Sequence, residues 1–290
     1  MKKFSINPIE RFIIRNHKGI RIALYVIGLA AALTLIILYD SLPIWAVLAF
    51  AFAIAIPMTL VDLVAVFKFS KIIKTANNQL DLSATLDASD KMLSILKPVQ
   101  LDYIGTAALC KATALYDMGE EEEAKKCSYA FLDKCDIKKP PYSQMTDHHV
   151  LLASMALNDY DFKEYEFRKS RMERCIADSS KSIQYFFKKN GIADALDLNY
   201  RLRSSESFDE ALEDERLNQP EYKNGKPIPE SKRSPLSFVS AYGALFEYSS
   251  RLGNQEKAHY YARKICRLAN EQFKSYREAK DYLDNEDIAD

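Results

Sequence analysis

The chain of 290 residues is long enough for one large domain or two ordinary ones, and its 48% apolar content is enough for a hydrophobic core. Eight glycines and ten prolines exclude collagen-like and Pro/Gly-rich disordered classes, and five scattered cysteines exclude a disulfide scaffold. The 40 basic and 40 acidic residues balance only globally: residues 1–74 carry a net charge of +6 and residues 75–290 a net charge of −6. The two parts therefore face different surroundings.

Residues 1–19 form a basic juxtamembrane segment ahead of the first long apolar run. Within it, Ile9, Phe12 and Ile13 recur at helical spacing among basic side chains, a pattern typical of a short helix lying on an anionic leaflet. A disordered basic tail that only sets the membrane orientation would have the same composition. The sequence leaves both alternatives open.

Residues 20–69 are predicted to form a transmembrane helical hairpin, with spans at about residues 22–39 and 43–67. Each span contains 18 consecutive uncharged residues. As a helix such a run covers roughly 27 Å, close to the hydrocarbon thickness of a bilayer. A cleaved signal peptide is the alternative for the first run, but the run is too long and no small-residue cleavage site follows it. A buried soluble hairpin is the alternative for both, and two adjacent uncharged runs argue against it.

The distribution of basic residues predicts the orientation of this hairpin. Six bases precede the first span and three follow the second, whereas the connecting turn carries only Asp40. By the positive-inside rule, both termini of this two-span integral membrane protein are expected in the cytoplasm. The five cysteines would then lie in a reducing compartment as free thiols or small buried hydrophobes.

A short connection makes the two spans antiparallel, so counting outward from its midpoint predicts which residues share a depth. Arg21 and Asp62 are equidistant from that midpoint, and we expect an ion pair that fixes the rotation of the two helices. The alternative is that Asp62 reaches interfacial water or faces the lysines that follow it. The same count places small residues opposite one another, as close packing in membranes prefers: Gly28 with Ala55, and Ala32 with Ala51.

Residues 70–290 predict a cytoplasmic all-α domain, because helix formers dominate and runs of β-branched residues are absent. Gly119 and Gly253 fall at turns and suit the left-handed position that ends a helix. Residues 70–97 are expected to form an atypical first hairpin, and residues 271–284 a charged cap. Four segments between them share one pattern, an apolar-periodic helix, a tight turn and a second helix: 108–135, 149–176, 195–217 and 238–273.

One segment of this domain fits no helix. Residues 218–236 carry four prolines, one glycine and few apolar side chains, so we expect a long loop that interrupts the array. A binding or lid loop and a solvated insertion are both consistent with this composition.

The turns carry a resemblance to a known family. Gly119 followed by Ala124, Gly253 followed by Ala258, and the strings DYDFKEY (159–165) and SFDEALE (207–213) resemble the turn and second helix of tetratricopeptide repeats. The resemblance covers roughly residues 101–273 and implies an α-solenoid in which small residues let paired helices approach. Those residues are Ala112, Ala124, Ala153, Ala211 and Ala258.

The sequence also departs from this family. Turn-to-turn spacings of about 41, 47 and 46 residues exceed the period of 34 residues. The family's tryptophan and closing proline are missing. We therefore interpret the chain as a two-helix transmembrane hairpin followed by an irregular, tetratricopeptide-like α-solenoid.

No residue pattern indicates catalysis or metal binding. The motifs of nucleotide-binding loops, serine hydrolases and zinc peptidases are absent from the sequence. His148 and His149 are adjacent, and neighbours on a helix point about 100° apart, so they cannot share a metal as residues four apart can. We expect no enzymatic activity, no metal and no cofactor.

Tyrosines are the most conspicuous side chains of the helical domain, since 15 of 17 lie beyond residue 75. Tyr242, Tyr248, Tyr260 and Tyr261 crowd the last hairpin, either as core packing or as the lining of a groove that accepts a peptide. The net charge of −6 disfavours nucleic acid.

Two function classes remain. We expect a membrane-tethered scaffold or adaptor that binds a protein or peptide partner at the cytoplasmic face of the lipid bilayer, because solenoids offer extended surfaces. The alternative is an enzyme or transport-complex component whose site sequence patterns do not show.

Overall fold

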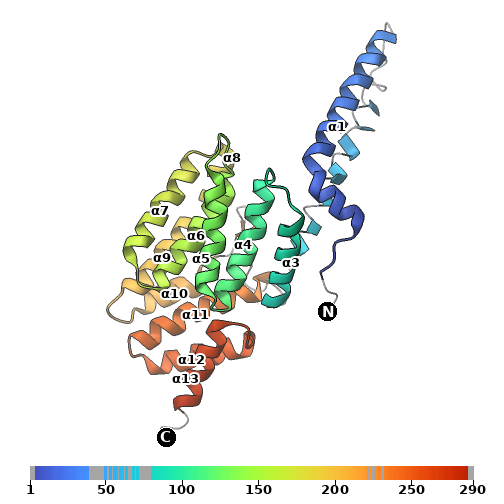
Figure 1. Cartoon of the computed structure of the whole chain (residues 1–290). Coiled ribbons are helices and arrows are strands. Elements are labelled where there is room, and N and C mark those ends of the chain that lie inside the picture. The colour runs from blue at the N-terminus through green and yellow to red at the C-terminus, as the bar shows by residue number, and fades with distance from the viewer. Residues whose placement is uncertain are drawn as a thin grey trace.

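The computed structural model describes residues 4–38, 80–220, 222–223, 226–229 and 232–286, and parts of the segment between residues 49 and 71. In these residues the fold is all-α, as predicted. The strands described are two short ones, β1 (Tyr222–Lys223) and β2 (Lys226–Pro227), which pair as an antiparallel hairpin inside the predicted loop. Figure 1 shows a long N-terminal helix that projects from a compact array of shorter helices.

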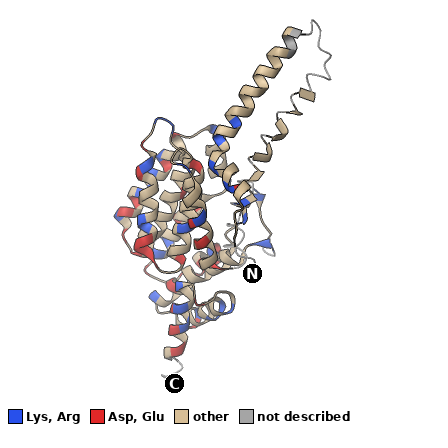
Figure 2. Ribbon diagram, turned by 45° about the vertical axis from the view of Figure 1, so that its right-hand side comes forward, with Lys and Arg blue, Asp and Glu red and all other residues tan. Residues whose placement is uncertain are grey.

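The long helix α1 (Pro8–Leu38) begins at a capping box. The Asn7 amide donates to Glu10 Oε2 (2.9 Å) and the Glu10 amide donates to Asn7 Oδ1 (2.8 Å), so two free amides of the first turn are satisfied. Among the described residues, α1 is the one helix long and apolar enough to cross a membrane. In Figure 2 the charged residues of α1 gather at its lower end, beside the helical array.

The four predicted hairpins correspond to four helix pairs. The helices after α1 are α3 (Leu82–Ile95), α4 (Leu101–Asp117), α5 (Glu121–Leu132), the 3₁₀ turn η1 (Asp133–Cys135), α6 (Tyr142–Asn158), α7 (Phe162–Ala177), α8 (Lys181–Lys189), α9 (Ile192–Ser204), α10 (Glu210–Asn218), α11 (Pro235–Arg251), α12 (Gln255–Leu268) and α13 (Lys274–Glu286). The pairs are α4–α5, α6–α7, α9–α10 and α11–α12. The short helix α8, between the second and third pairs, was not predicted.

The tight turns have the backbone that the glycines predicted. Gly119 (φ +83°) ends α4 and Gly253 (φ +71°) ends α11 in the left-handed region. Tyr160 (φ +57°) occupies the same position after α6, where its hydroxyl donates to Glu247 Oε1 at 3.1 Å. A residue with a side chain is strained in this region.

Four of the five small residues that were expected at close helix contacts are fully buried, namely Ala112, Ala124, Ala153 and Ala258. Ala211 is exposed in the first turn of α10, so the prediction for this residue was wrong. Larger clusters of buried apolar side chains fill the spaces between successive helix pairs.

The array closes on itself. Gln272, in the turn between α12 and α13, accepts hydrogen bonds through Oε1 from the amides of Leu82 (2.9 Å) and Ser83 (3.2 Å) at the start of α3. Phe273 is 2% exposed and packs in one cluster with Leu80 and Leu82. The first and last parts of the domain therefore touch, unlike an open solenoid in which each repeat contacts only its neighbours.

Candidate functional site

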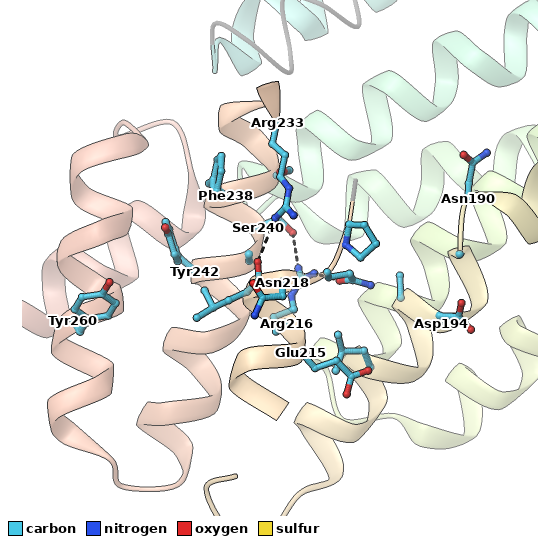
Figure 3. A pocket seen from close by; sticks show the side chains of 18 residues that line it. Asn190, Asp194, Glu215, Arg216, Asn218, Arg233, Phe238, Ser240, Tyr242 and Tyr260 are labelled. Carbon is cyan, nitrogen blue, oxygen red and sulfur yellow. Dashed lines mark hydrogen bonds between the residues drawn. The ribbon is translucent and has the colours of Figure 1, made fainter. Parts of the chain in front are cut away.

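A pocket of about 710 Å³ opens between α9, α10 and α11, and two of the four predicted tyrosines line it. Tyr242 is half-buried and Tyr260 is 50% exposed. In Figure 3 these two rings lie on one side of the pocket, and Asn190 and Asp194 lie on the opposite side. The pocket is wide enough for a side chain or short peptide segment.

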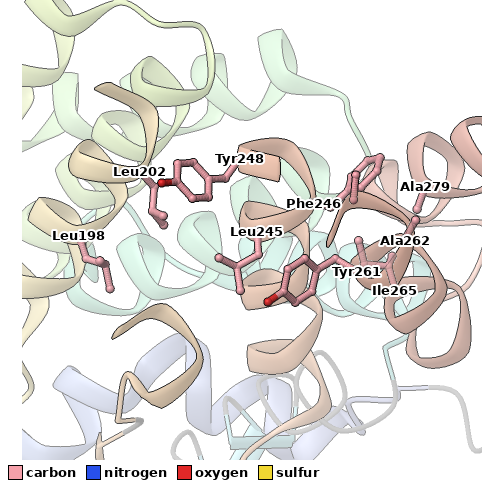
Figure 4. Close-up of a cluster of buried hydrophobic side chains, with 10 residues drawn as sticks. Leu198, Leu202, Leu245, Phe246, Tyr248, Tyr261, Ala262, Ile265 and Ala279 are labelled. Carbon is pink, nitrogen blue, oxygen red and sulfur yellow. The ribbon is translucent and has the colours of Figure 1, made fainter. Parts of the chain in front are cut away.

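The other two predicted tyrosines are core residues. Tyr248 is 2% exposed and Tyr261 is 1% exposed, and both belong to the cluster shown in Figure 4. The Tyr248 hydroxyl accepts from the Asp209 amide (2.8 Å) and donates to the Ser207 carbonyl (3.2 Å). Both rings are therefore packed inside the domain and do not form part of an accessible binding surface.

Arg216 is half-buried in the pocket wall on α10. Its Nη2 donates to Ser240 Oγ on α11 (3.4 Å), its Nη1 donates to Gln219 Oε1, and its Nε is buried without a hydrogen-bond partner. Burial, and secondarily the nearby Arg203, lowers the pKa of the Arg216 guanidinium to about 10. The group therefore remains charged at neutral pH.

Arg233 approaches the same pocket from the residues that precede α11. Its Nη1 donates to the Leu217 carbonyl at 3.3 Å, and its Nε is buried without a hydrogen-bond partner. Two guanidinium groups from separate segments thus converge on one cavity. An arrangement of this kind stabilises an anion more than a neutral group.

Nearby arginines have carboxylate partners, whereas among the described residues these two have none. Arg201 pairs with Glu215, and Arg203 pairs with Glu247 at 2.6 Å. Within the described part of the chain, no carboxylate lies within ion-pair distance of Arg216 or Arg233. The hydrogen-bond partners described for the two guanidinium groups are therefore all neutral.

A basic face of α12 continues this surface. Tyr260 lines both the first pocket and a second one of about 650 Å³, and the Lys264 ammonium lies 5.2 Å from the centre of the Tyr260 ring. Arg263, Lys264 and Arg267 line the second pocket together with Glu256. The sequence did not indicate this surface, because Arg and Lys on a helix usually face solvent and nothing in the pattern showed that they adjoin a cavity.

The predicted membrane residues are described only in part. Arg21 is half-buried, Gly28 is buried, Ala32 is half-buried and Ala55 is exposed. Asp62 and Ala51 lie outside the described residues. The Arg21–Asp62 ion pair and the packing of small residues therefore stay predictions.

The two adjacent histidines have different surroundings. His148 is fully buried, with Nδ1 3.1 Å from Ser128 Oγ and Nε2 3.1 Å from the Gly105 carbonyl. His149 is 3% exposed, and both its ring nitrogens lack hydrogen-bond partners. Burial lowers the pKa of each to about 4. No group of three or more metal-binding side chains occurs among the described residues.

Comparison of the chain with models of protein families, with curated proteins and with solved structures finds no match.

Proposed function

We propose that this chain is a membrane-anchored adaptor whose helical domain binds an acidic segment of a partner protein. The observation that carries the proposal is the pair of guanidinium groups, Arg216 and Arg233, that face one pocket without a carboxylate partner among the described residues. A bound acidic side chain would receive charge-assisted hydrogen bonds there.

The surroundings of the pocket favour a peptide as the ligand. Tyr242 and Tyr260 supply rigid aromatic walls, the kind of side chain that anchors protein interfaces. Beyond Tyr260, the basic face of α12 extends the positive surface past the pocket. A segment with acidic residues at successive positions would therefore contact both regions. Asp194 lies on the opposite side of the pocket, where its negative charge would repel an acidic ligand, so we expect the acidic side chain to bind on the arginine side.

The proposed anchor is a hairpin of two spans with both termini in the cytoplasm. The Lys68 ammonium lies 2.8 Å from Glu10 Oε2 and donates to the Ser5 carbonyl at 2.9 Å. These contacts bring the end of the second apolar run beside the beginning of α1, which supports an antiparallel arrangement. The proposal retains an Arg21–Asp62 ion pair between the spans and an irregular tetratricopeptide-like array outside the membrane.

Peptide binding to the full chain in lipid nanodiscs tests the proposal. The ligand is a fluorescent peptide of alternating glutamate and leucine, compared by anisotropy with a lysine–leucine peptide of equal length. Arg216→Gln and Arg233→Gln should each weaken binding of the acidic peptide by about tenfold or more, since a charge-assisted hydrogen bond contributes roughly 1.5–3 kcal/mol.

The control variant is Arg174→Gln, which removes a 73% exposed arginine on α7 and should leave the affinity unchanged. Equal binding of the acidic and basic peptides, or equal losses in all three variants, would show that the pocket does not select acidic segments.

A further inference from the structure

The helical domain has two differently charged edges. The turns within the first three hairpins form one edge and contain five acidic residues and no basic one; they are residues 118–120, 159–161 and 205–209. The connections that precede these three hairpins form the opposite edge and contain seven lysines and three aspartates, a net charge of +4; they are residues 96–100, 133–141 and 178–191. Because consecutive helices run in opposite directions, the segments that connect them alternate between the two edges (Figure 1).

Contacts between the turns confirm that the acidic ones lie together. Lys125, just after the first turn, is 2.9 Å from Asp159 in the second. Helix α11 contacts both the second and the third turn. Its Glu247 accepts from the Tyr160 hydroxyl of the second turn, and its Arg251 donates to the Ser205 carbonyl of the third at 2.8 Å. The turns and connections of the two edges therefore differ in charge, and Lys125, Arg251 and Arg277 from neighbouring helices contact the turns of the acidic edge.

The basic edge also exposes apolar side chains. Each connection carries at least one: Val99 is 66% exposed, Ile137 46%, Tyr185 63% and Phe186 49%. Each has an exposed lysine one to three residues away in the sequence. Apolar and aromatic side chains flanked by lysines are typical of surfaces that lie at a membrane interface.

The basic edge lies at the level where α1 enters its uncharged run. The Lys18 ammonium donates to the Val99 carbonyl (2.8 Å), and the Lys97 ammonium donates to Asn16 Oδ1 (2.8 Å). Lys18 precedes Ile22, the first residue of that run, by four positions, or roughly 6 Å along the helix. The connection 96–100 is thus held at the depth expected for lipid headgroups.

Buried contacts keep the array in this position relative to α1. Gln100 is 1% exposed, and its Nε2 donates to the Ile14 carbonyl (2.7 Å) and lies 3.2 Å from His17 Nδ1. Ile14 is fully buried in a cluster with Met92 and Ala107 of the array. The helix that enters the membrane is therefore packed into the domain, and the domain cannot turn freely about it.

We infer that the basic edge of the array docks on the anionic lipid surface of the same membrane that α1 enters, with Tyr185 and Phe186 of α8 as its outermost contact. This rests on the membrane anchoring in the proposed function. Lysines of the edge would neutralise anionic headgroups while the exposed apolar side chains enter the interface. The acidic edge would then face away from the membrane.

Fluorescence quenching by brominated lipids tests this docking in the full chain. The only tryptophan, Trp45, lies in the second apolar run and reports insertion of the anchor. In a Trp45→Phe background, Tyr185→Trp reports the basic edge. Tyr260→Trp, at a 50% exposed position on α12, is the matched control.

Nanodiscs of zwitterionic lipid, with and without anionic phosphatidylglycerol, supply the membrane. We expect quenching of Trp45 in both lipids, quenching of the residue-185 probe in anionic lipid only, and none at residue 260. Lys188→Glu should weaken docking by roughly fivefold or more, whereas Lys280→Glu, an exposed reversal on α13, should have no effect.

The outcomes separate the two claims. If Trp45 is quenched and the residue-185 probe is not, the anchor stands and the docking is wrong. If Trp45 is not quenched, the membrane anchoring fails and the docking fails with it. If the residue-185 probe is quenched equally in zwitterionic lipid and in the Lys188→Glu variant, the lysines do not attract the edge to anionic lipid, and the inference is overturned.

Discussion

Arg203 on α9 and Glu247 on α11 form an ion pair of 2.6 Å in which the arginine is almost completely buried. Arg203 also donates to Asn158 of α6, whose amide contacts the Tyr116 hydroxyl of α4. One polar network thus links the first helix of each of the four hairpins. Because these helices are distant in the sequence, the network fixes how successive hairpins are placed relative to one another.

Removing Glu247 should destabilise the domain. Glu247→Ala leaves the buried Arg203 guanidinium without its carboxylate, and we expect a loss of about 1–3 kcal/mol in the free energy of unfolding, at the lower end because Glu247 is 37% exposed. Urea unfolding of the detergent-solubilised chain, followed by circular dichroism, measures it. Lys126→Ala breaks an exposed pair with Glu123 and should cost less than about 0.5 kcal/mol. Equal effects would show that the network adds nothing.

Two helical glycines should respond oppositely to alanine. A Cβ on Gly105 would lie 2.6 Å from Phe131 Cζ and 2.7 Å from Gln144 Cβ, so Gly105→Ala should destabilise the domain by about 1–3 kcal/mol. A Cβ on Gly243 would meet its nearest atom, Ser275 Cβ, at 3.7 Å. There the gain in helix propensity should stabilise by about 0.5–1 kcal/mol. Thermal unfolding of the two variants decides the sign of each change.

The adjacent histidines should also respond oppositely. His148→Leu removes the partner of the buried Ser128 hydroxyl and should destabilise by about 1–3 kcal/mol. His149→Leu replaces two buried ring nitrogens that have no hydrogen-bond partner, and should stabilise the domain by about 1 kcal/mol at pH 7. Denaturant unfolding is the measurement, and a loss of stability in both variants would contradict the prediction.

The gain from His149→Leu should grow as the pH falls. Burial lowers the pKa of His149 to about 4. Below about pH 6.5 this residue is therefore protonated in the unfolded chain but remains neutral in the folded chain until the pH approaches 4. His149 should therefore lower the free energy of unfolding of the parent chain by roughly 2 kcal/mol as the pH falls from 7 to 5. Burial raises the pKa of Asp117 and Asp147 to about 7, which acts in the opposite direction. Comparing variant with parent at each pH cancels those two terms.

Exchanging the two residues of the proposed Arg21–Asp62 pair should restore what each single substitution removes. Arg21→Ala and Asp62→Ala each leave one charge without compensation, whereas Arg21→Asp combined with Asp62→Arg restores the pair. We expect reduced protease resistance of the membrane-inserted chain in both single variants and substantial recovery in the double one. Silent single changes would indicate that Asp62 is an ordinary interfacial residue.

Local patterns predicted much of this fold, and the misses have physical causes. The helix pairs follow from apolar periodicity, and Gly119 and Gly253 mark two of their turns because glycine readily adopts the left-handed backbone that ends these helices. Helix α8 was missed because its nine residues follow α7 after a very short turn. The closure through Gln272 joins residues 190 positions apart, and no local pattern reports such a contact.

The candidate site was less predictable than the helices. Tyrosine suits both a core and an interface, so the sequence could not separate Tyr248, which is buried, from Tyr260, which is exposed. Arg216 and Arg233 stand out because no carboxylate among the described residues pairs with them, and that property depends on how α10, Arg233 and α11 are placed relative to one another.

The contact between Gln272 and the beginning of α3 should affect hydrogen exchange in α3. Gln272→Ala removes the acceptor of two amides at the start of α3, so the Leu82 and Ser83 amides should exchange with solvent faster. Gln184→Ala removes a local contact to the Ala177 and Ser179 carbonyls and should leave α3 unchanged. Hydrogen exchange with mass spectrometry makes the comparison. Unchanged protection of α3 in the Gln272 variant would mean that the contact carries no stability.

The same contact sets an order of events during translation. The amides at the beginning of α3 find their partner in Gln272, which is made 190 residues later. At about 5–20 residues per second, roughly 10–40 seconds separate the two on the ribosome. During that time the Leu82 and Ser83 amides lack their acceptor, and the apolar side chains that pack against Phe273 lack that contact. The nascent chain therefore carries an incomplete array, with part of its apolar surface uncovered, until its last helices emerge.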